Sequence, residues 1–530
     1  MGGGVNLNTN KELLLPLSFE EIRSELGQNL SRMMDFFVPV EEIEKEISLI
    51  ASAIKHSGKL VLIHGKPGVG KSTFIQSLKW RNHIPVKEVF NIDVTNSSIF
   101  KHTEPKLPKL LQVISEACEK NDIIPNKNGV FTFVIDYLES LSGEDPNLRK
   151  AFFQNLNGIL RQKPILILWP ITELEDINLI KDYSSAVSGT LFYRGKESID
   201  FRGPSKEQYS RIVKNTITVL NTGYTYNDFL LTDGDFDEVR YKFEKKGSFY
   251  TLRDYIIEVL ELWKKRSNQN ERILSKIPKQ TEIWFVFCMP EAEQLVTQFA
   301  RKSKNTDDCW DAYFTKLDEY IHDNQKEAIW TPNRLQLAIS GVFKTKAIYI
   351  PTNALVSCIA AYGKNSKSYS KIDWKNSGIS SNWYNISTAT KFMHNSPLVK
   401  QLLSKPVQFG NARGGSVKES LEKAKKAYEG INAISSNFIP TRDGSDKPFN
   451  KIIASALTDL LPQYKVSTET PHPLLTNIIP DIMIEKSDRN VCLEFHYTKK
   501  TVPSAIADYI LKKLDIYMRQ IESLFPDILS

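Results

Sequence analysis

Little in this sequence of 530 residues points to an extracellular or membrane protein. The five cysteines are scattered, odd in number and never paired as Cys-x-x-Cys, which argues for a reducing compartment and against a zinc site. No apolar run approaches the length of a bilayer span. The first ten residues are rich in Gly and Asn and have no apolar core of the kind that a signal peptide needs. We therefore expect a cytoplasmic protein without a membrane partner.

The composition is that of an ordinary globular protein, with 41% hydrophobic and 25% charged residues. A chain of 530 residues is too long for a single core, so several domains are expected. The net charge is +7, and it is unevenly distributed, because residues 361–450 hold 14 Lys and Arg against 6 Asp and Glu. A polyanion such as DNA is therefore expected to bind at 361–450 and in the C-terminal domain.

A strand, a glycine-rich turn and a helix follow one another early in the chain. An apolar run at 60–63 leads into a stretch that fits the pattern GxxxxGK[ST] in every position and consists of Gly65, Lys66, Pro67, Gly68, Val69, Gly70, Lys71, Ser72 and Thr73. The glycines let backbone N–H groups curl around phosphates, and the following helix presents its positive end. Lys71 places a cation on the phosphates, and the Ser72 hydroxyl can ligate Mg²⁺. The stretch predicts a site for ATP and Mg²⁺.

Strand and helix alternate over the first 200 or so residues, which predicts a doubly wound parallel sheet. Helices alone are expected at 205–220, 235–246 and 250–266. Between 270 and 400 no fold can be assigned, although helices are expected at 291–303, 310–323 and 335–342, and the stretch 361–400 suggests loops or an exposed polar surface. A second α/β pattern follows, with expected elements at 447–461 (helix), 464–469, 478–485 and 491–498 (strands) and 503–524 (helix).

The apolar strand 129–136 ends in Asp136, where a P-loop fold needs a second acidic group for the Mg²⁺ shell. Most AAA+ ATPases place a glutamate directly after it, and here Tyr137 follows. The run from 134 to 141 resembles the strand-end element of the NACHT branch of STAND ATPases, and the resemblance covers about residues 30–265. It implies that Asp136 ligates magnesium and that Glu139 orients water. Alternatively, Glu139 is a solvated helix residue, and nucleotide binding matters more than turnover.

Three further residues are candidates for the same site. Thr172 follows the strand at 165–169 and matches the position of the polar residue that senses the γ-phosphate in AAA+ proteins. Either Arg194 or Arg253 could supply a cation to the transition state.

A second acidic site is predicted near the C-terminus. Asp481 opens one predicted strand, and Glu494 and His496 share one face of the next, because side chains two apart point the same way. If the strands pair, Asp481 and Glu494 converge, and two such carboxylates can hold Mg²⁺ for attack on a phosphodiester. Lys513 lies on the polar side of the helix at 503–524, with Tyr509, Lys512 and Tyr517.

The order Pro480-Asp481 and Glu494-Phe495-His496 resembles the PD-(D/E)xK nuclease superfamily, with histidine in place of lysine. Lys500 could replace that lysine if the strand continues, and Asp446 or Glu469 could add a carboxylate. The structural alternative is a hairpin with two surface acids.

Between the two sites, aromatic residues alternate with lysines from Lys364 to Lys405. Such a mixture could grip a phosphate backbone and stack bases. Equally, it could be a loop anchored to the core by its tryptophans. The residues in question are Lys367, Tyr369, Lys371, Trp374, Lys375, Trp383, Tyr384 and Lys391.

The predicted fold class is a multidomain α/β protein. The expected domains are a tail and helix (1–35), a P-loop ATPase core (36–204), a helical lid (205–269), a helical and basic linker domain (270–435) and a nuclease-like domain (436–530). Such a fusion resembles bacterial or archaeal defence proteins, and it implies a homo-oligomer, a possible protein partner and ATP-controlled DNA cleavage. Two rival interpretations are a signalling or scaffold ATPase with a degenerate nuclease fold used for binding, and an ATPase that loads or remodels a partner on DNA.

Overall fold

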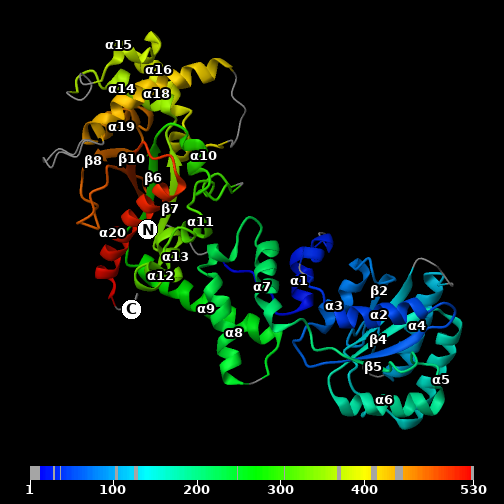
Figure 1. Ribbon diagram of the computed structural model, residues 1–530. Coiled ribbons are helices and arrows are strands. Elements are labelled where there is room, and N and C mark those ends of the chain that lie inside the picture. The colour runs from blue at the N-terminus through cyan, green and yellow to red at the C-terminus, as the bar shows by residue number, and fades with distance from the viewer. Residues whose placement is uncertain are drawn as a thin grey trace. The chain divides into compact units, whose positions relative to one another are not determined.

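The computed structural model describes residues 12–27, 30–35, 37–101, 105–123, 129–247, 249–303, 305–366, 372–407, 415–435 and 446–526 (Figure 1). The chain forms two compact units. The first unit contains residues 13–222 and 235–262, and the second unit contains residues 223–234 and 263–530.

The first unit is built on a five-stranded parallel sheet in the order β2-β3-β4-β1-β5. β4 lies between β1 and β3, so the carboxyl ends of β1, β4 and β3 lie along one edge of the sheet. This arrangement confirms the predicted parallel α/β fold. The strands are β1 (Lys59–His64), β2 (Val86–Asp93), β3 (Val130–Asp136), β4 (Ile165–Ile171) and β5 (Ser198–Asp200).

Helices cover both faces of this sheet. Successive strand residues point to opposite sides, and since both sets are apolar here, both faces must be shielded from water. One face packs against α4 (Lys106–Lys120), α5 (Pro146–Gln162) and α6 (Leu174–Val187) through residues such as Phe133. The other face packs against α2 (Glu41–Ala53) and α3 (Lys71–Ser77) through residues such as Val134.

The N-terminal segment of the first unit packs on the helices that follow the sheet. It contains α1 (Phe19–Leu26) and a 3₁₀ turn at Leu30–Asp35, and the later helices are α7 (Lys206–Leu220), α8 (Asp233–Lys246) and α9 (Leu252–Leu274). The Asn221 side chain accepts from the Leu14 N–H at 3.0 Å and donates to the Leu14 carbonyl at 2.9 Å. Arg32 donates to the carbonyl of Val219 at 2.7 Å. The segment before the sheet is therefore fixed to α7.

The second unit is built on a mixed sheet in the order β7-β6-β10-β9-β8. β7, β6 and β10 are parallel, and β9 is antiparallel to both β10 and β8. The strands are β6 (Gln280–Cys288), β7 (Phe343–Tyr349), β8 (Lys465–Thr468), β9 (Ile482–Glu485) and β10 (Arg489–Tyr497).

The sequence does not predict β6 and β7, which lie in the region without an assignable fold. Both strands are buried along nearly their whole length. β6 therefore lacks the alternation that marks a half-exposed strand, and β7 contains Lys344 and Lys346, which do not suggest a buried strand. Both pair within the sheet that contains β10, so this sheet draws on residues on either side of position 436.

The helices of the second unit lie between and after these strands. The predicted helices at 447–461 and 503–524 are present as α19 and α20. The helices are α10 (Ala292–Val296), α11 (Phe314–Asp318), α12 (Asp323–Ala328), α13 (Pro332–Ser340), α14 (Thr352–Tyr362), α15 (Trp374–Ser377), α16 (Ile386–His394), α17 (Pro397–Leu402), α18 (Gly415–Ser435), α19 (Lys447–Leu460) and α20 (Pro503–Leu524). Within the described ranges, none of the helices is long and apolar enough to span a bilayer.

The connection between α7 and α8 belongs to the second unit. Asp228 forms an ion pair with Arg301 in which both side chains are only 13% exposed. The buried Gln336 donates to the carbonyl of Asn227, and Arg266 donates to the carbonyl of Leu230 at 2.7 Å. Residues 223–234 are thus held by side chains of the second unit.

A buried histidine orders the connection that leads from β8 to β9. His472 Nδ1 accepts from the N–H groups of Leu474 and Leu475 at 3.2 and 3.0 Å. The Nε2 atom lies 3.1 Å from the hydroxyl of Thr281, so the neutral ring donates there. Burial lowers the pKa of His472 to about 4.

We expect the second unit to lose stability on acidification because of His472. In the unfolded chain the His472 ring is protonated below its ordinary pKa of about 6.5, whereas in the folded chain it becomes protonated only near pH 4. Stability is therefore lost as pH falls through this window, by up to about 1.4 kcal/mol per pH unit. Thermal unfolding followed between pH 7.5 and 5 measures the slope. In His472→Asn, which has no titrating ring, this slope should be shallower, and an unchanged slope would contradict the assignment.

Candidate functional site

The glycine-rich turn joins β1 to α3 with the backbone conformations that glycine permits. Gly68 and Gly70 have φ values of 82° and 97°, in the left-handed region that other residues rarely adopt. Gly65 lies close to another strand end, because a Cβ on it would be 2.5 Å from the carbonyl oxygen of Phe201. The turn therefore needs glycine for conformation and for close packing.

Gly68 gives a direct test of this geometry. A Cβ on Gly68 would lie 2.8 Å from Thr251 Oγ1 and 2.9 Å from Arg253 Cβ, in addition to the strain of positive φ. We expect Gly68→Ala to lower the free energy of unfolding by about 2–3 kcal/mol and to weaken ATP binding. The control is Gly195→Ala, at φ 77° with open space around it, which should cost only about 1–2 kcal/mol. Chemical denaturation and calorimetric titration measure both quantities, and equal effects would refute the packing argument.

A cavity of about 350 Å³ lies over this turn, entirely within the first unit. Most of the predicted nucleotide residues line it, namely Lys66, Pro67, Gly68, Gly70, Lys71, Ser72, Thr73, Asp136, Glu139, Thr172 and Arg253. Gly65 and Val69 do not line it. Val69 is buried beneath the turn, and Gly65 faces Phe201. Arg194 is exposed and lies outside the cavity lining.

Lys71 lies at the floor of the cavity, in the first turn of α3. Its ammonium donates to the carbonyl of Gly65 and, at 3.3 Å, to that of Lys66. Burial lowers the pKa of Lys71, and the carboxylate of Glu139 opposes that shift. Glu139 therefore acts on the same ammonium that the sequence assigns to the phosphates.

Asp136 stands at the carboxyl end of β3, between two donors. The Asn91 amide donates to it at 3.2 Å, and the N–H of Tyr137 donates at 3.1 Å. Burial raises the pKa of Asp136, and although these two hydrogen bonds lower it, the nearby carboxylates of Glu20 and Asp93 raise it further. A cation would relieve this crowding of negative charge, so Asp136, together with the Ser72 hydroxyl, fits a Mg²⁺ ion.

Thr172 and Arg253, two other predicted residues, also line the cavity. The Thr172 hydroxyl is buried, and no hydrogen-bond partner for it exists among the described residues. Such a group is costly unless something else satisfies it. Arg253 lies in the first turn of α9, where its N–H donates to the carbonyl of Gly68 at 3.2 Å and its Nε donates to the carbonyl of Leu17 at 3.3 Å.

The N-terminal segment forms a wall of the cavity that the motifs did not reveal. The sequence predicts a helix within residues 1–35 but gives no sign of what it packs against. Apolar side chains of this wall and of the later helices include Phe19, Ile22, Phe37, Val38, Ile212 and Ile256. They offer a surface for a flat apolar group such as a base, opposite the charged loop.

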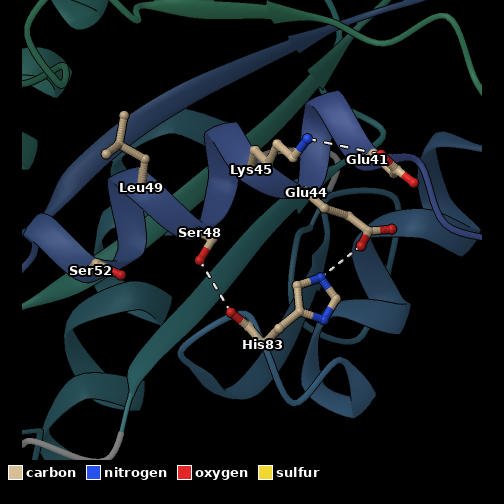
Figure 2. Close-up of a pocket in the computed structure, with 7 residues that line it drawn as sticks. All are labelled: Glu41, Glu44, Lys45, Ser48, Leu49, Ser52 and His83. Carbon is tan, nitrogen blue, oxygen red and sulfur yellow. Dashed lines mark hydrogen bonds and ion pairs between the residues drawn. The ribbon is translucent and has the colours of Figure 1, made fainter.

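A second hollow of about 480 Å³ lies over α2 (Figure 2). Its buried carboxylate, Glu44, accepts from His83 Nε2 at 2.7 Å and from Arg81, and Ser48 donates to the carbonyl of His83 at 3.2 Å. Its main polar groups thus satisfy one another. It contains none of the predicted site residues.

In the second unit, β9 and β10 pair as the acidic site requires. Ile482 lies opposite Leu493 in the antiparallel ladder, so Asp481 comes opposite Glu494 on the same face. The N–H of Phe495 donates to Asp481 Oδ2 at 2.7 Å. The structure therefore brings the two predicted carboxylates together.

Two residues of α20 hold Glu494, which is only 1% exposed. Lys513 Nζ donates to Oε2 and the Tyr517 hydroxyl donates to Oε1, each at 2.7 Å. Burial and the charge of Glu494 raise the pKa of Asp481 well above its usual range, although Lys513 opposes the shift. Lys513 thus pairs with Glu494, and Asp481, which lies opposite Glu494, is pushed toward its neutral form.

His496 does not act as the cation of this site. Its ring stacks on Tyr509 with a centroid distance of 4.0 Å, and burial, together with Lys500 and Lys513, lowers its pKa to about 4. β10 ends at Tyr497, so the condition under which Lys500 would share the Glu494 face is not met, and Lys500 is exposed. Lys513 holds the place of the cation, and a short linear motif could not reveal it because Lys513 comes from α20.

Few of the described carboxylates are near enough to this site to hold a metal. No group of three or more His, Cys, Asp or Glu side chains is arranged to hold a metal in the ranges that the structure describes. Glu469 pairs with Lys447 at 3.0 Å, and Asp446 precedes α19. Mg²⁺ commonly binds one or two carboxylates, its other ligands being water and substrate phosphate. Asp481 and Glu494 are compatible with that mode.

The basic segment between the two sites is anchored to the core by a tryptophan. Trp383 is 4% exposed and packs edge-on against Phe392 with ring centroids 5.6 Å apart. Base stacking by Trp383 is thus excluded in this structure. The anchoring agrees with the alternative prediction, but the segment is not a loop, because α15, α16, α17 and a 3₁₀ turn at Ser381–Tyr384 lie within it. Lys367, Tyr369 and Lys371 lie outside the described residues, as does the Lys375 side chain.

Comparison with known proteins gives only distant similarity. No family model matches the sequence, and no curated protein matches it. The chain is similar to a chain of the HORMA:CdnC:Trip13 complex of E. coli MS115-1, with 14% identity, covering 44% of this chain and 79% of that chain at a TM-score of 0.25. It is also similar to a chain of Drosophila ORC bound to poly(dA/dT) DNA and Cdc6, with 10% identity, covering 83% of this chain and 73% of that chain at a TM-score of 0.24. These TM-scores are too low to assign the chain to either family.

Proposed function

We propose that this protein binds ATP and Mg²⁺ in the cavity of the first unit and hydrolyses ATP. The observation that supports this proposal is that one cavity gathers the glycine-rich turn, Lys71, Asp136, Thr172 and Arg253, which are far apart in the sequence. The backbone N–H groups of the turn and the ammonium of Lys71 would hold the phosphates. Ser72 and Asp136 would hold Mg²⁺, which neutralises charge on the phosphates when it is bound.

We further propose that the nucleotide controls a DNA nuclease in the second unit. Asp481 and Glu494 lie on one face of the sheet, and Lys513 supplies the cation that the sequence lacks at His496. The two carboxylates would hold Mg²⁺, which supplies an activated water and a Lewis acid for phosphodiester cleavage when it is bound. Lys513 would help to orient the attacking water or the phosphate. A role in defence against phage or plasmids, as a homo-oligomer, is part of this proposal.

One experiment separates these proposals. Supercoiled plasmid is incubated with the whole chain and Mg²⁺, with and without ATP, beside EDTA controls and the Lys513→Met variant. We expect strand breaks that require both Mg²⁺ and ATP and that Lys513→Met abolishes. Cleavage that ignores ATP would remove the coupling between the units. Plasmid retention in a gel without breaks would favour the binding alternative, and DNA-stimulated ATP hydrolysis without breaks would favour a loader or remodeller.

A further inference from the structure

The position that most AAA+ ATPases use to activate water holds a tyrosine in this chain. Tyr137 has a φ of 58°, its N–H donates to Asp136, and its side chain is 51% exposed. We propose that Glu20, on the N-terminal helix α1, is the carboxylate that positions and deprotonates the attacking water. This inference rests on the proposed ATP hydrolysis and deepens it.

Glu20 lines the nucleotide cavity although it is 116 positions from Asp136 in the sequence. Its carboxylate is close enough to the end of β3 to raise the pKa of both Asp136 and Tyr137, for which burial is the larger cause. Glu20, Lys71 and Asp136 line the same cavity. A water held by Glu20 would therefore lie in the cavity that also contains the proposed phosphate and magnesium groups.

The first turn of α1 is held in a fixed place relative to the loop. The Ser18 hydroxyl accepts from the N–H of Glu21 at 3.2 Å, and the Glu21 carboxylate accepts from the N–H of Leu17 at 2.9 Å. The carbonyl of Leu17 accepts from Arg253, whose own N–H donates to the carbonyl of Gly68. Glu20 is therefore presented from a capped helix that is joined to the phosphate loop through Arg253.

The carboxylates around the cavity are engaged differently. Glu21 is used in the helix cap, and Glu139 acts on the ammonium of Lys71. The Glu20 carboxylate forms no hydrogen bond or ion pair within the part of the chain that the structure describes, so no protein group holds it away from a water in the cavity. Its position in the first turn also favours the helix electrostatically, and the experiment below distinguishes this structural role from catalysis.

The proposed step is balanced without any further reactant. The water oxygen forms a bond to the γ-phosphorus while its proton passes to the Glu20 carboxylate. The bond between the γ-phosphorus and the bridging oxygen breaks, and ADP leaves with that electron pair. The proton then returns from Glu20 to phosphate or solvent. General base catalysis of this kind contributes roughly 10²- to 10⁴-fold to the rate.

The test compares Glu20→Gln with Glu25→Gln in the full chain, with ATP hydrolysis and ATP binding measured separately. Glu25 is an exposed glutamate of the same helix that does not line the cavity, so its variant should behave as the parent protein. We expect Glu20→Gln to lower kcat by roughly 10²-fold or more, with ATP affinity and melting temperature unchanged. Glu139→Gln, in contrast, should change ATP affinity more than kcat.

The outcomes are distinguishable. Hydrolysis by Glu20→Gln at the parent rate would overturn the assignment, and so would a loss confined to ATP affinity or to thermal stability. If the parent chain binds ATP and does not hydrolyse it, the assignment fails while nucleotide binding stands. If the parent chain does not bind ATP, the proposed function itself fails.

Discussion

Replacement of Lys71 by alanine is expected to weaken ATP binding by roughly 10- to 100-fold, because hydrogen bonds to charged groups are worth about 1.5–3 kcal/mol. The ammonium lies over the turn, where it already donates to the carbonyls of Gly65 and Lys66. Its loss removes the one cation of α3's first turn that reaches the cavity. Any hydrolysis should fall further, since charge on the phosphates increases in the transition state.

Calorimetric titration with ATP and Mg²⁺ measures the change in affinity for Lys71→Ala. Lys79→Ala is the matched control, because Lys79 follows α3 and pairs at the surface with Glu88, 3.2 Å away, outside the cavity lining. The control should bind ATP as the parent does. Equal affinity in the parent and in Lys71→Ala would remove the nucleotide site from this cavity.

Replacement of Glu494 by alanine is expected to destabilise the second unit by about 1–3 kcal/mol, since it leaves a buried hydrogen-bond donor unsatisfied. Lys513 and Tyr517 would both lose their acceptor. Tyr517 is buried, whereas the Lys513 side chain is 34% exposed, so water can solvate its charge. DNA cleavage should be lost as well, because one of the two carboxylates of the site is gone.

The stability effect of Glu494→Ala can be assigned to its unit by scanning calorimetry, since two compact units are expected to give separate transitions. Only the transition of the second unit should move. The double variant Glu494→Leu with Lys513→Met should recover most of the loss, because it removes both charges. Glu485→Ala, which breaks a surface pair with Lys465, serves as control. If Glu494→Ala is as stable as this control, the Glu494–Lys513 pair does not contribute to the stability of the second unit as expected.

Local signals were enough to predict much of the fold. The parallel sheet of the first unit follows from apolar strands that alternate with helices, and α19 and α20 begin at the predicted residues. β6 and β7 were not predictable in the same way. β6 is one apolar run without alternation from Ile283 to Cys288, whereas β7 contains Lys344, Thr345 and Lys346, which do not suggest a buried strand. The pairing of β6 with β10, and of β7 with β6, establishes both as strands.

The residues of the candidate sites also differ in how far the sequence could predict them. The residues of the glycine-rich turn, Asp136 and the pair Asp481 and Glu494 belong to short motifs, so spacing alone singles them out. Lys513 and Glu20 belong to no motif. Lys513 meets Glu494 because α20 packs on β10, and Glu20 enters the cavity because α1 is fixed beside the loop. Packing between elements that are far apart in the sequence determines whether such residues enter a site, and the spacing of residues along the chain does not show that packing.

The segment 223–234 has a practical consequence for dissecting the protein. It is encoded between two helices of the first unit, yet its partners Arg301 and Gln336 lie in the second unit. A truncation that ends at residue 262 would retain this segment, but Asp228 would lose its ion pair with Arg301 and the carbonyl of Asn227 would lose the hydrogen bond from Gln336. A fragment that starts at residue 263 would leave Arg301 without Asp228. No single division point in the sequence therefore separates the two units. To test whether separate fragments can reassemble, segment 223–234 would have to be supplied together with residues 263–530.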